Sequence, residues 1–327
     1  MSTIVITGAR GYIGSALAGQ LAGEGKELRL VSRTSEGLRL ETTSKAKIEH
    51  CSADLRRPQD WLRLLDGASA VVHLSSRTDL RAAEEDPAGD RVLNVEPVYA
   101  LVRAAEHCRT AVAVIFASST SIAGDAHTNP VNEKTPDRPC SVYDRHKLEC
   151  EVVLRDAFRR DLLQACSLRL PTVYGYGAGV TSTNLNRGVL NAMIRRASRG
   201  EPLTLYGDGS VVRDFIHVDD VCDAFRRAIA RPDICQGTHY VIATGHGYTL
   251  AEAFGCVADV YRAMGRKVEI SHVPEPPNLH AIERSNFVGD SAMFRKLTGW
   301  RPQIDLRSGI RDYCERLLAS AQTASVV

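Results

Sequence analysis

The chain lacks the sequence features that mark extracellular, metal-binding and membrane-spanning proteins. Its nine cysteines are scattered, without a CxxC pair or a close Cys/His cluster, so the sequence predicts neither a disulfide framework nor a metal site. No apolar run approaches the roughly 18 residues that a membrane span needs. The first residues have the pattern of a strand rather than of a signal peptide. We therefore expect a reduced, cytoplasmic protein.

A strong charge of one sign is also missing. The formal net charge is +2, from 41 basic and 39 acidic residues that are interleaved along the chain. Such a mixed surface offers no footprint for a polyanion, and we expect neither a nucleic acid nor a membrane partner. With 327 residues, the chain is long enough for one large core and a smaller second lobe.

Short apolar runs alternate with amphipathic segments in the first half of the chain. We expect strands at 4–6, 28–31, 70–74 and 111–116, and helices at 92–107 and 143–160. This alternation predicts an α/β protein with a doubly wound parallel sheet. We expect a Rossmann domain over residues 1–172, with returning segments near 208–243 and 285–292. An interleaved, mixed α/β substrate lobe would occupy 173–327.

A glycine-rich loop follows the first expected strand and opens a helix. It contains Gly8, Arg10, Gly11, Tyr12, Ile13 and Gly14. Glycine permits the tight turn and the close approach of backbone to a pyrophosphate, and the helix N-terminus offers free N–H groups to that anion. The strand–turn–helix order around the loop predicts a dinucleotide site.

An acidic residue is missing where NAD-binding proteins commonly carry one. The second expected strand ends in Val31-Ser32-Arg33. An acidic side chain there accepts a hydrogen bond from the ribose 2′-hydroxyl of NAD, whereas arginine suits the 2′-phosphate of NADP. Arg33, together with Arg10 of the glycine loop, would bind that phosphate bidentately. We expect NADP(H) rather than NAD; the alternative is that both arginines are ordinary solvated side chains.

Tyr143 and Lys147 stand four residues apart, on one face of an expected helix. A free tyrosine has a pKa near ~10, and a neighbouring ammonium group lowers that pKa towards the working range of an acid or base. Ser119 follows the apolar strand that ends at Phe116, and its hydroxyl would hold a substrate oxygen in line. The YxxxK spacing also occurs by chance, but its combination with the glycine loop and the serine cluster predicts an oxidoreductase.

On these motifs, the chain resembles the extended short-chain dehydrogenase/reductases, in the branch of sugar-nucleotide epimerases, dehydratases and reductases. The resemblance runs over nearly the full length. Its most diagnostic stretch is 213–220, which reads RDFIHVDD and which generic Rossmann proteins lack. Further matching stretches are 53–55, 71–76, 94–95, 118–119, 168–175 and 289–302.

The resemblance implies a role for each matching residue. Ser119 would bind the C4 oxygen of the sugar, Tyr143 would exchange its proton, and Lys147 would anchor the nicotinamide ribose and tune Tyr143. Beyond the glycine loop, Ser32 and Arg33, the implied cofactor contacts are Asp54, Leu55, Leu74, Ser75, Ser76, Asn94, Tyr143, Lys147 and Pro171. The implied substrate contacts are Ser119, Thr120, Thr172, Val189, Leu190, Thr204, Leu205, Tyr206, Arg213 and Arg284.

Family membership leaves the reaction open. The 4,6-dehydratases of this branch carry an Asp-Glu pair after the catalytic threonine; here Thr120 and Ser121 stand in those places, so dehydration is not expected. The main prediction is NADPH-dependent reduction of the C4 keto group of a nucleotide-linked 4-keto-6-deoxyhexose, because Ser32, Arg33 and Arg10 suit exchangeable NADPH. The alternative is an NAD-dependent nucleotide-sugar 4-epimerase similar to UDP-glucose 4-epimerase. A remote alternative is a non-catalytic NADP-binding sensor or scaffold.

Relatives of this type usually dimerise through a four-helix bundle. The resemblance implies a homodimer through the helices expected at 92–107 and 143–160, although the valines there equally suit packing on the sheet. Among the histidines, His73 and His217 are expected to be hydrogen-bonded structural residues. His146 is expected to be exposed.

Overall fold

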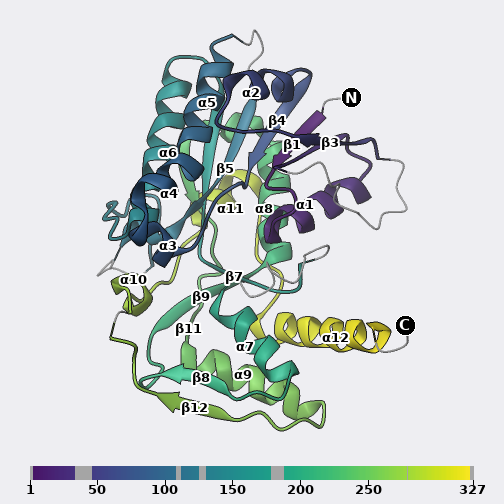
Figure 1. Cartoon of the computed structure of the whole chain (residues 1–327), viewed down its shortest axis with the longest axis vertical. Helices are drawn as coiled ribbons and strands as arrows, with labels where there is room; N and C mark the ends of the chain where they lie inside the picture. The colour runs from purple at the N-terminus through teal and green to yellow at the C-terminus, as the bar shows by residue number, and fades with distance from the viewer. Residues whose placement is uncertain are drawn as a thin grey trace.

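The structure is a computed structural model that describes residues 3–33, 46–107, 112–124, 130–177, 188–277 and 279–324, with only the backbone from 320 onwards. Its centre is a seven-stranded parallel sheet in the order β10-β6-β5-β4-β1-β2-β3 (Figure 1). The strands are β1 (Thr3–Thr7), β2 (Leu28–Ser32), β3 (Ile48–Ser52), β4 (Ala68–His73), β5 (Ala113–Ser119), β6 (Gln164–Leu170) and β10 (Gln236–Val241). The expected α/β fold with a parallel sheet is confirmed.

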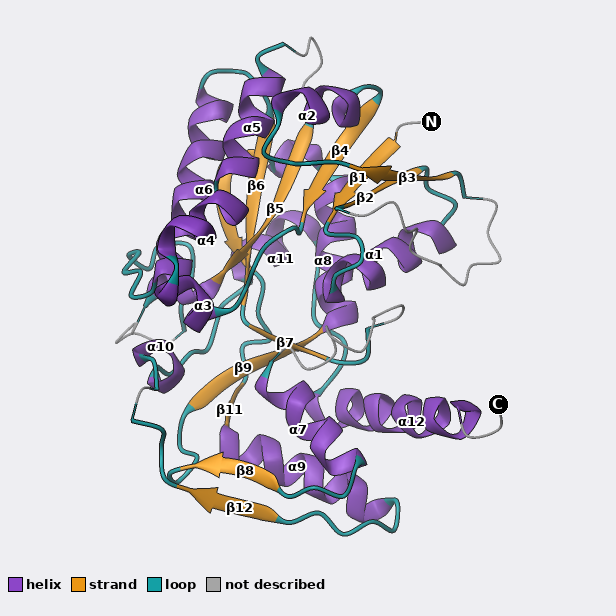
Figure 2. Cartoon of the chain, viewed as in Figure 1, coloured by secondary structure: helices purple, strands orange, loops and turns teal. Residues whose placement is uncertain are grey.

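Helices cover both faces of this sheet (Figure 2). One apolar core joins the sheet to α1 (Tyr12–Gly23), α8 (Val218–Ala230) and α11 (Ala292–Thr298). The other joins it to α2 (Pro58–Leu65), α5 (Glu96–Ala105) and α6 (Val142–Arg159). Within β1, Ile6 belongs to the first core and Val5 to the second, because successive residues of a strand face opposite sides. A strand covered on both faces is therefore apolar throughout.

The prediction of a single helix at 92–107 is wrong, because the structure has two helices there. They are α4 (Pro87–Asn94) and α5, and they meet at Val95, which caps both. Pro97 lies in the first turn of α5. Proline lacks the N–H that would continue a helix across this point, and it disfavours helical backbone in the residue before it. The short helix α3 (Leu80–Glu85) precedes this pair.

The remaining elements form a second lobe around a third apolar core, below the central sheet in Figure 1. Strands β7 (Thr172–Tyr174), β9 (Val212–His217) and β11 (Gly247–Thr249) make one small sheet, and β8 (Leu203–Tyr206) pairs with β12 (Ile270–Val273). The helices here are α7 (Val189–Ser198), α9 (Leu250–Ala263), α10 (Ala281–Arg284) and α12 (Leu306–Ala324). Two 3-10 turns, η1 (Thr120–Ala123) and η2 (Pro232–Ile234), complete the described elements.

The topology determines where a ligand can bind. The strand order reverses between β1 and β4, and open parallel sheets bind ligands beyond the carboxyl ends of their strands at such a reversal. The glycine loop follows β1, and Ser119 ends β5 in register with Leu170 of β6. Across the described ranges, no helix is both long and apolar enough to cross a membrane.

Candidate active site

The backbone at Gly8 of the glycine loop lies so close to Ser75, just after β4, that no side chain fits at this position. Gly8 has a φ of +65°, and a Cβ there would lie 2.9 Å from the backbone nitrogen of Ser75. A Cβ at Gly14 would overlap the carbonyl oxygen of Gly8. The first turn of α1 carries no side-chain cap, so its N–H groups remain available to an anion.

A cleft of about 580 Å³ runs from this loop to the expected catalytic residues. Ser119, Tyr143 and Lys147 line the same cleft as the glycine loop, Ser32 and Arg33. Every expected cofactor residue except Asp54 and Asn94 belongs to the lining. The further lining residues are Val31, Ala53, Leu55, Leu74, Ser75, Ser76, Thr78, Ala117, Ser118, Leu170, Pro171, Thr172, Val173 and Gly188.

Asp54 and Asn94 lie beside the cleft rather than in its wall. Asp54 stands between the lining residues Ala53 and Leu55, and its carboxylate accepts two hydrogen bonds from Arg56, at 2.8 and 2.7 Å. These bonds lower the pKa of Asp54 to about 2. Asn94 is buried, and its Oδ1 accepts hydrogen bonds from Ser76 Oγ and from the backbone N–H of Arg77. Asn94 therefore contacts Ser76, which lines the cleft, and does not line the cleft itself.

The charged residues in the lining are all basic. They are Arg10, Arg33 and Lys147, and no Asp or Glu stands among the described lining residues. Together with the free N–H groups and the glycine surface, these cations fit a dinucleotide, whose phosphates need donors and positive charge. Elsewhere too, the described residues contain no cluster of three or more His, Cys, Asp or Glu that could hold a metal ion.

Lys147 is buried in the floor of the cleft. Its Nζ donates a hydrogen bond of 2.8 Å to the carbonyl oxygen of Ala117. It also lies 4.6 Å from the ring centre of Phe116 and 5.6 Å from that of Tyr143. Burial lowers the pKa of this lysine to about 8, so its charge is retained at neutral pH. The ammonium group is thus placed to stabilise negative charge on the neighbouring phenol.

Ser119 belongs to a hydrogen-bonded chain that the sequence analysis missed. Its Oγ lies 2.6 Å from Ser121 Oγ, and Ser121 Oγ donates to the carboxylate of Asp144. Asp144 is fully buried, and burial raises the pKa of its carboxyl group. The same carboxylate accepts a hydrogen bond from the backbone N–H of Ser141, completing a capping box at the start of α6. The SxxD pattern could have identified the cap, but not the contact with Ser121.

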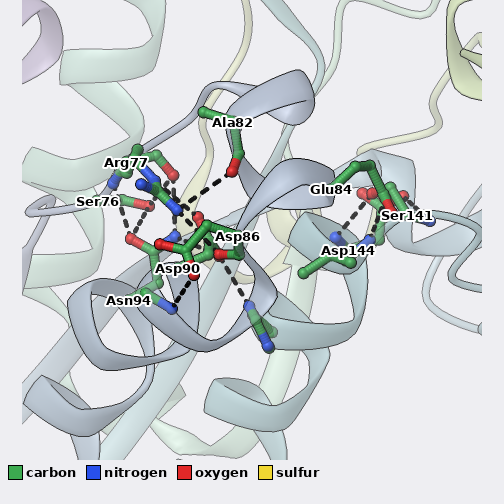
Figure 3. A network of polar contacts seen from close by, with 12 residues as sticks. Ser76, Arg77, Ala82, Glu84, Asp86, Asp90, Asn94, Ser141 and Asp144 are labelled. Atoms are coloured by element: carbon green, nitrogen blue, oxygen red, sulfur yellow. Dashed lines mark hydrogen bonds and ion pairs between the residues drawn. The ribbon is translucent and has the colours of Figure 1, made fainter.

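The expectation that His146 is exposed is wrong. Its Nδ1 lies 2.7 Å from the carboxylate of Asp90, and its side chain is 12% exposed. Asp90 has no exposed surface and also accepts hydrogen bonds from Arg77 Nε and Asn94 Nδ2 (Figure 3). This network ties α6 to α4 and to the loop after β4, because a buried carboxylate needs several donors. Only the tertiary contact, invisible in the local sequence, turns His146 inwards.

A buried ion pair supports the strands behind the cleft. Arg169 of β6 donates to both oxygens of Glu151 on α6, at 3.0 and 2.7 Å, and to Asp137. Ser118, which lines the cleft, donates to the same Glu151.

His73 and His217 are buried and hydrogen-bonded, as expected. His73 Nδ1 lies 2.8 Å from Thr7 Oγ1, whose oxygen also accepts from the backbone N–H groups of Leu74 and Ser75. Burial lowers the pKa of His73 to about 3, which keeps the ring neutral. His217 caps α8 by accepting from the backbone N–H of Asp219.

The expected substrate residues are only partly brought together. Thr172 lines the cleft with Ser119, whereas Thr120 is buried and donates to the carbonyl oxygen of Leu170. Thr120 therefore differs from its expected role, because its hydroxyl faces the strand behind it. Val189 and Leu190 begin α7 directly after Gly188, a lining residue. Leu190 is fully buried in the lobe core.

The other expected substrate residues lie in the second lobe, outside the cleft lining. Thr204, Leu205 and Tyr206 form β8, where Leu205 is buried and Tyr206 is 43% exposed. The guanidinium group of Arg213 donates to backbone carbonyl oxygens of Ile282, Glu283 and Ser285. Arg284 pairs with Glu275. In this structure both arginines thus make contacts within the lobe.

Comparison with known proteins supports the resemblance. The profile described as "NAD dependent epimerase/dehydratase family" matches residues 4–243. The UDP-glucose 4-epimerase of Mycolicibacterium smegmatis is 30% identical over 314 residues, which cover 94% of this chain and 95% of that protein. The dTDP-L-rhamnose 4-epimerase of Burkholderia thailandensis is 24% identical, with 94% and 92% covered.

Solved structures share the whole architecture. MoeE5 in complex with UDP-glucuronic acid and NAD has a TM-score of 0.83 and 26% identity, covering 98% of this chain and 100% of that one. The UDP-glucose-4-epimerase of Stenotrophomonas maltophila, with bound NAD and formylated UDP-arabinopyranose, has a TM-score of 0.85. It is 22% identical, with 99% and 100% covered, so it supports the fold alone.

Proposed function

The chain belongs to the NAD dependent epimerase/dehydratase family, and from this premise we propose that it is a nucleotide-sugar 4-epimerase. The observation that carries the proposal is that Ser119, Tyr143 and Lys147 line one cleft with the glycine loop. From the sequence alone, epimerisation is the alternative to the main prediction, which is reduction of a 4-keto sugar. The names of the relatives favour it over the reductase.

Tyr143, Ser119 and Lys147 each have a distinct role in this reaction. Tyr143 takes the proton from the C4 oxygen of the sugar and returns it, while Ser119 holds that oxygen. The ammonium group of Lys147, 5.6 Å from the Tyr143 ring centre, favours the phenolate form. When bound, the dinucleotide supplies a hydride acceptor and donor at its nicotinamide. The glycine loop and the start of α1 would hold its pyrophosphate.

A second candidate is the NADPH-dependent reduction of a 4-keto-6-deoxyhexose. It is favoured by Arg10 and Arg33, which line the cleft beside Ser32, where the described lining residues include no Asp or Glu. A 2′-phosphate would gain two bidentate donors there, whereas this described part of the lining offers the 2′-hydroxyl of NAD no acidic partner. The MoeE5 complex contains NAD, so the cofactor is the sharpest distinction between the two candidates.

One experiment separates the candidates. The purified protein is denatured with acid and the released dinucleotide is identified by chromatography, and a second sample is incubated with UDP-glucose without added cofactor. The epimerase predicts released NAD and formation of UDP-galactose or of another 4-epimer from a UDP-sugar panel. The reductase predicts no retained NAD, no epimer, and NADPH oxidation only when a 4-keto sugar is added. If none of these reactions occurs, both candidates are rejected.

Substrate contacts and assembly extend the proposal. We propose that Thr172 contacts the sugar beside Ser119, and that the start of α7 binds the diphosphate through its backbone N–H groups. Arg213 and β8 would contribute only after a rearrangement of the lobe. We further propose a homodimer through α5 and α6, because a groove of about 700 Å³ lies between these helices. Leu148, Val152 and Val153 line it.

A further inference from the structure

Three polar side chains lead from the cleft into the interior beside Tyr143. Ser119 ends β5 and lines the cleft, Ser121 follows in η1, and Asp144 lies in the first turn of α6. The η1 turn fixes the first link, since the backbone N–H of Ser121 donates to Ser119 Oγ at 3.2 Å. The two hydroxyl oxygens are 2.6 Å apart, and Ser121 Oγ contacts the Asp144 carboxylate. The chain ends at Asp144, which is fully buried.

The number of protons available to Ser119, Ser121 and Asp144 determines which group donates in each hydrogen bond. Two oxygens 2.6 Å apart share a single proton, and Ser121 has only one hydroxyl proton to donate. When Asp144 is ionised, Ser121 donates to the carboxylate and Ser119 must donate to Ser121. When Asp144 is protonated, it can donate to Ser121, and Ser121 then donates to Ser119. The carboxyl group therefore determines in which direction both hydroxyl groups point.

We propose that Asp144 is a positioning residue that, through Ser121, sets whether Ser119 accepts or donates a hydrogen bond at the C4 oxygen of the substrate. This proposal rests on the proposed function. With Asp144 ionised, Ser119 presents a lone pair to the cleft, which suits a sugar hydroxyl group. With Asp144 protonated, Ser119 presents its proton, which suits the carbonyl oxygen of a 4-keto sugar and the oxyanion that forms as it is reduced.

The surroundings of Asp144 act on the pKa of its carboxyl group in opposite directions. Burial raises the pKa of its carboxyl group, whereas hydrogen bonds from Ser121 and Ser141 and the charge of His280 on α10 lower it. The thiol of Cys140 lies 3.8 Å away. Glu84 of α3 also faces this region: it accepts a hydrogen bond from the backbone N–H of Val142 and lies 3.6 Å from His280 (Figure 3).

Substitutions at two positions of the chain separate this role from a structural one. In Asp144→Asn, the amide oxygen must accept from the backbone N–H of Ser141 to keep the cap, which turns the amide nitrogen towards Ser121. In this variant the amide nitrogen donates to Ser121, Ser121 donates to Ser119, and Ser119 can only donate its proton towards the cleft. Ser121→Ala disconnects Ser119 from Asp144 while keeping the cap. The control is Ser141→Ala, which removes the hydroxyl that accepts from the Asp144 backbone but leaves the chain intact.

The kinetic test is the pH dependence of a single reductive turnover. Protein loaded with reduced dinucleotide is mixed with a nucleotide-linked 4-keto sugar, and the loss of nicotinamide absorbance is followed. In the wild type, we expect a limb on which the rate falls by up to about tenfold per pH unit as Asp144 ionises. Asp144→Asn and Ser121→Ala should lose this limb. Ser141→Ala should keep it, displaced to higher pH because a Ser141 hydrogen bond that lowers the pKa of Asp144 is lost, and should also lower Tm. An unchanged limb in Asp144→Asn overturns the proposal.

A spectroscopic readout tests the proposal without turnover. In protein labelled with ¹³C at the aspartate carboxyl groups, one resonance absent from Asp144→Asn should titrate above the usual aspartate range. Because the Ser121 hydrogen bond lowers the pKa of Asp144, Ser121→Ala should raise that midpoint. A midpoint that does not move contradicts the coupling. If the wild type fails to reduce any 4-keto sugar while this titration behaves as expected, it is the proposed function that fails.

Discussion

Among the residues that the structure describes, the ammonium group of Lys147 has one hydrogen-bond acceptor, the carbonyl oxygen of Ala117, and two aromatic rings lie beside it. Its side chain is almost fully buried, and this desolvation disfavours the charged form that the chemistry requires. The lysine that we propose tunes Tyr143 therefore lowers the stability of the fold. Such a conflict between stability and activity is common where function needs a buried charge.

The change Lys147→Met should raise stability and abolish activity. The unfolded chain holds the lysine proton up to a pKa of about 10.5, and the folded chain only up to about 8. Below pH 8 the buried charge therefore costs the whole difference between these two pKa values, on the order of 3 kcal/mol, and this cost disappears as pH rises from 8 to 10.5. Denaturant unfolding at pH 7 and pH 10 should show a stability gain that shrinks with pH. A variant less stable than wild type at pH 7 would contradict the assigned cost.

At the scale of elements, β6 and α6 are joined behind the cleft by the Arg169–Glu151 ion pair. Both side chains are buried, with exposed fractions of 3% and 5%. Removing one partner leaves an uncompensated charge, which is far more costly than replacing the whole pair by apolar residues. The pair therefore fixes the register between the strand that lines the cleft and the helix that carries Tyr143.

The change Glu151→Gln should destabilise the chain by up to about 3–5 kcal/mol. Arg169 then keeps Asp137 as a carboxylate partner, so its charge is only partly compensated, and the double change Glu151→Gln with Arg169→Met should recover part of the cost. Denaturant midpoints of the two single variants, the double variant and the wild type give the coupling free energy. Additive effects would show that the two groups do not act as a pair.

Much of this arrangement could be predicted from the sequence, where the signal is local. The expected strands at 4–6 and 28–31 lie within β1 and β2, and the glycine loop and the Tyr143/Lys147 pair line one cleft. The contacts of His146 and Asp144 could not be predicted, because their partners Asp90 and Ser121 come from distant segments. A second lobe over 173–327 was expected, but its strands could not be predicted, since β7 and β9 are short strands paired across a long stretch of chain.

At the scale of the whole molecule, an apolar groove on the surface of the Rossmann half remains uncovered in the single chain. It lies between α5 and α6, and its lining includes Tyr99, Val102, Leu148 and Val152. Two valines of the expected interface, Val95 and Val98, are instead buried in the core on the sheet. A dimer would therefore use the outer faces of these helices.

The change Val152→Glu should convert the proposed homodimer into a monomer, because a carboxylate beside Leu148 and Val153 would lose its hydration when a second copy covers the groove. Val92→Glu is the matched control, since Val92 is 40% exposed on α4 and does not line the groove. Sedimentation velocity measures both variants beside the wild type. A wild-type monomer, or a Val152→Glu dimer, would reject this interface.

We propose that Tyr143 exchanges a proton with the C4 oxygen of a nucleotide-linked sugar, and the roles of Ser119 and Lys147 depend on this exchange. The most direct measurement is the interconversion of C4 epimers by the wild type and by Tyr143→Phe, followed by NMR on the UDP-sugar. We predict that the variant keeps its fold and its dinucleotide but loses turnover by about 10²–10⁴-fold. Undiminished turnover in Tyr143→Phe would contradict the account.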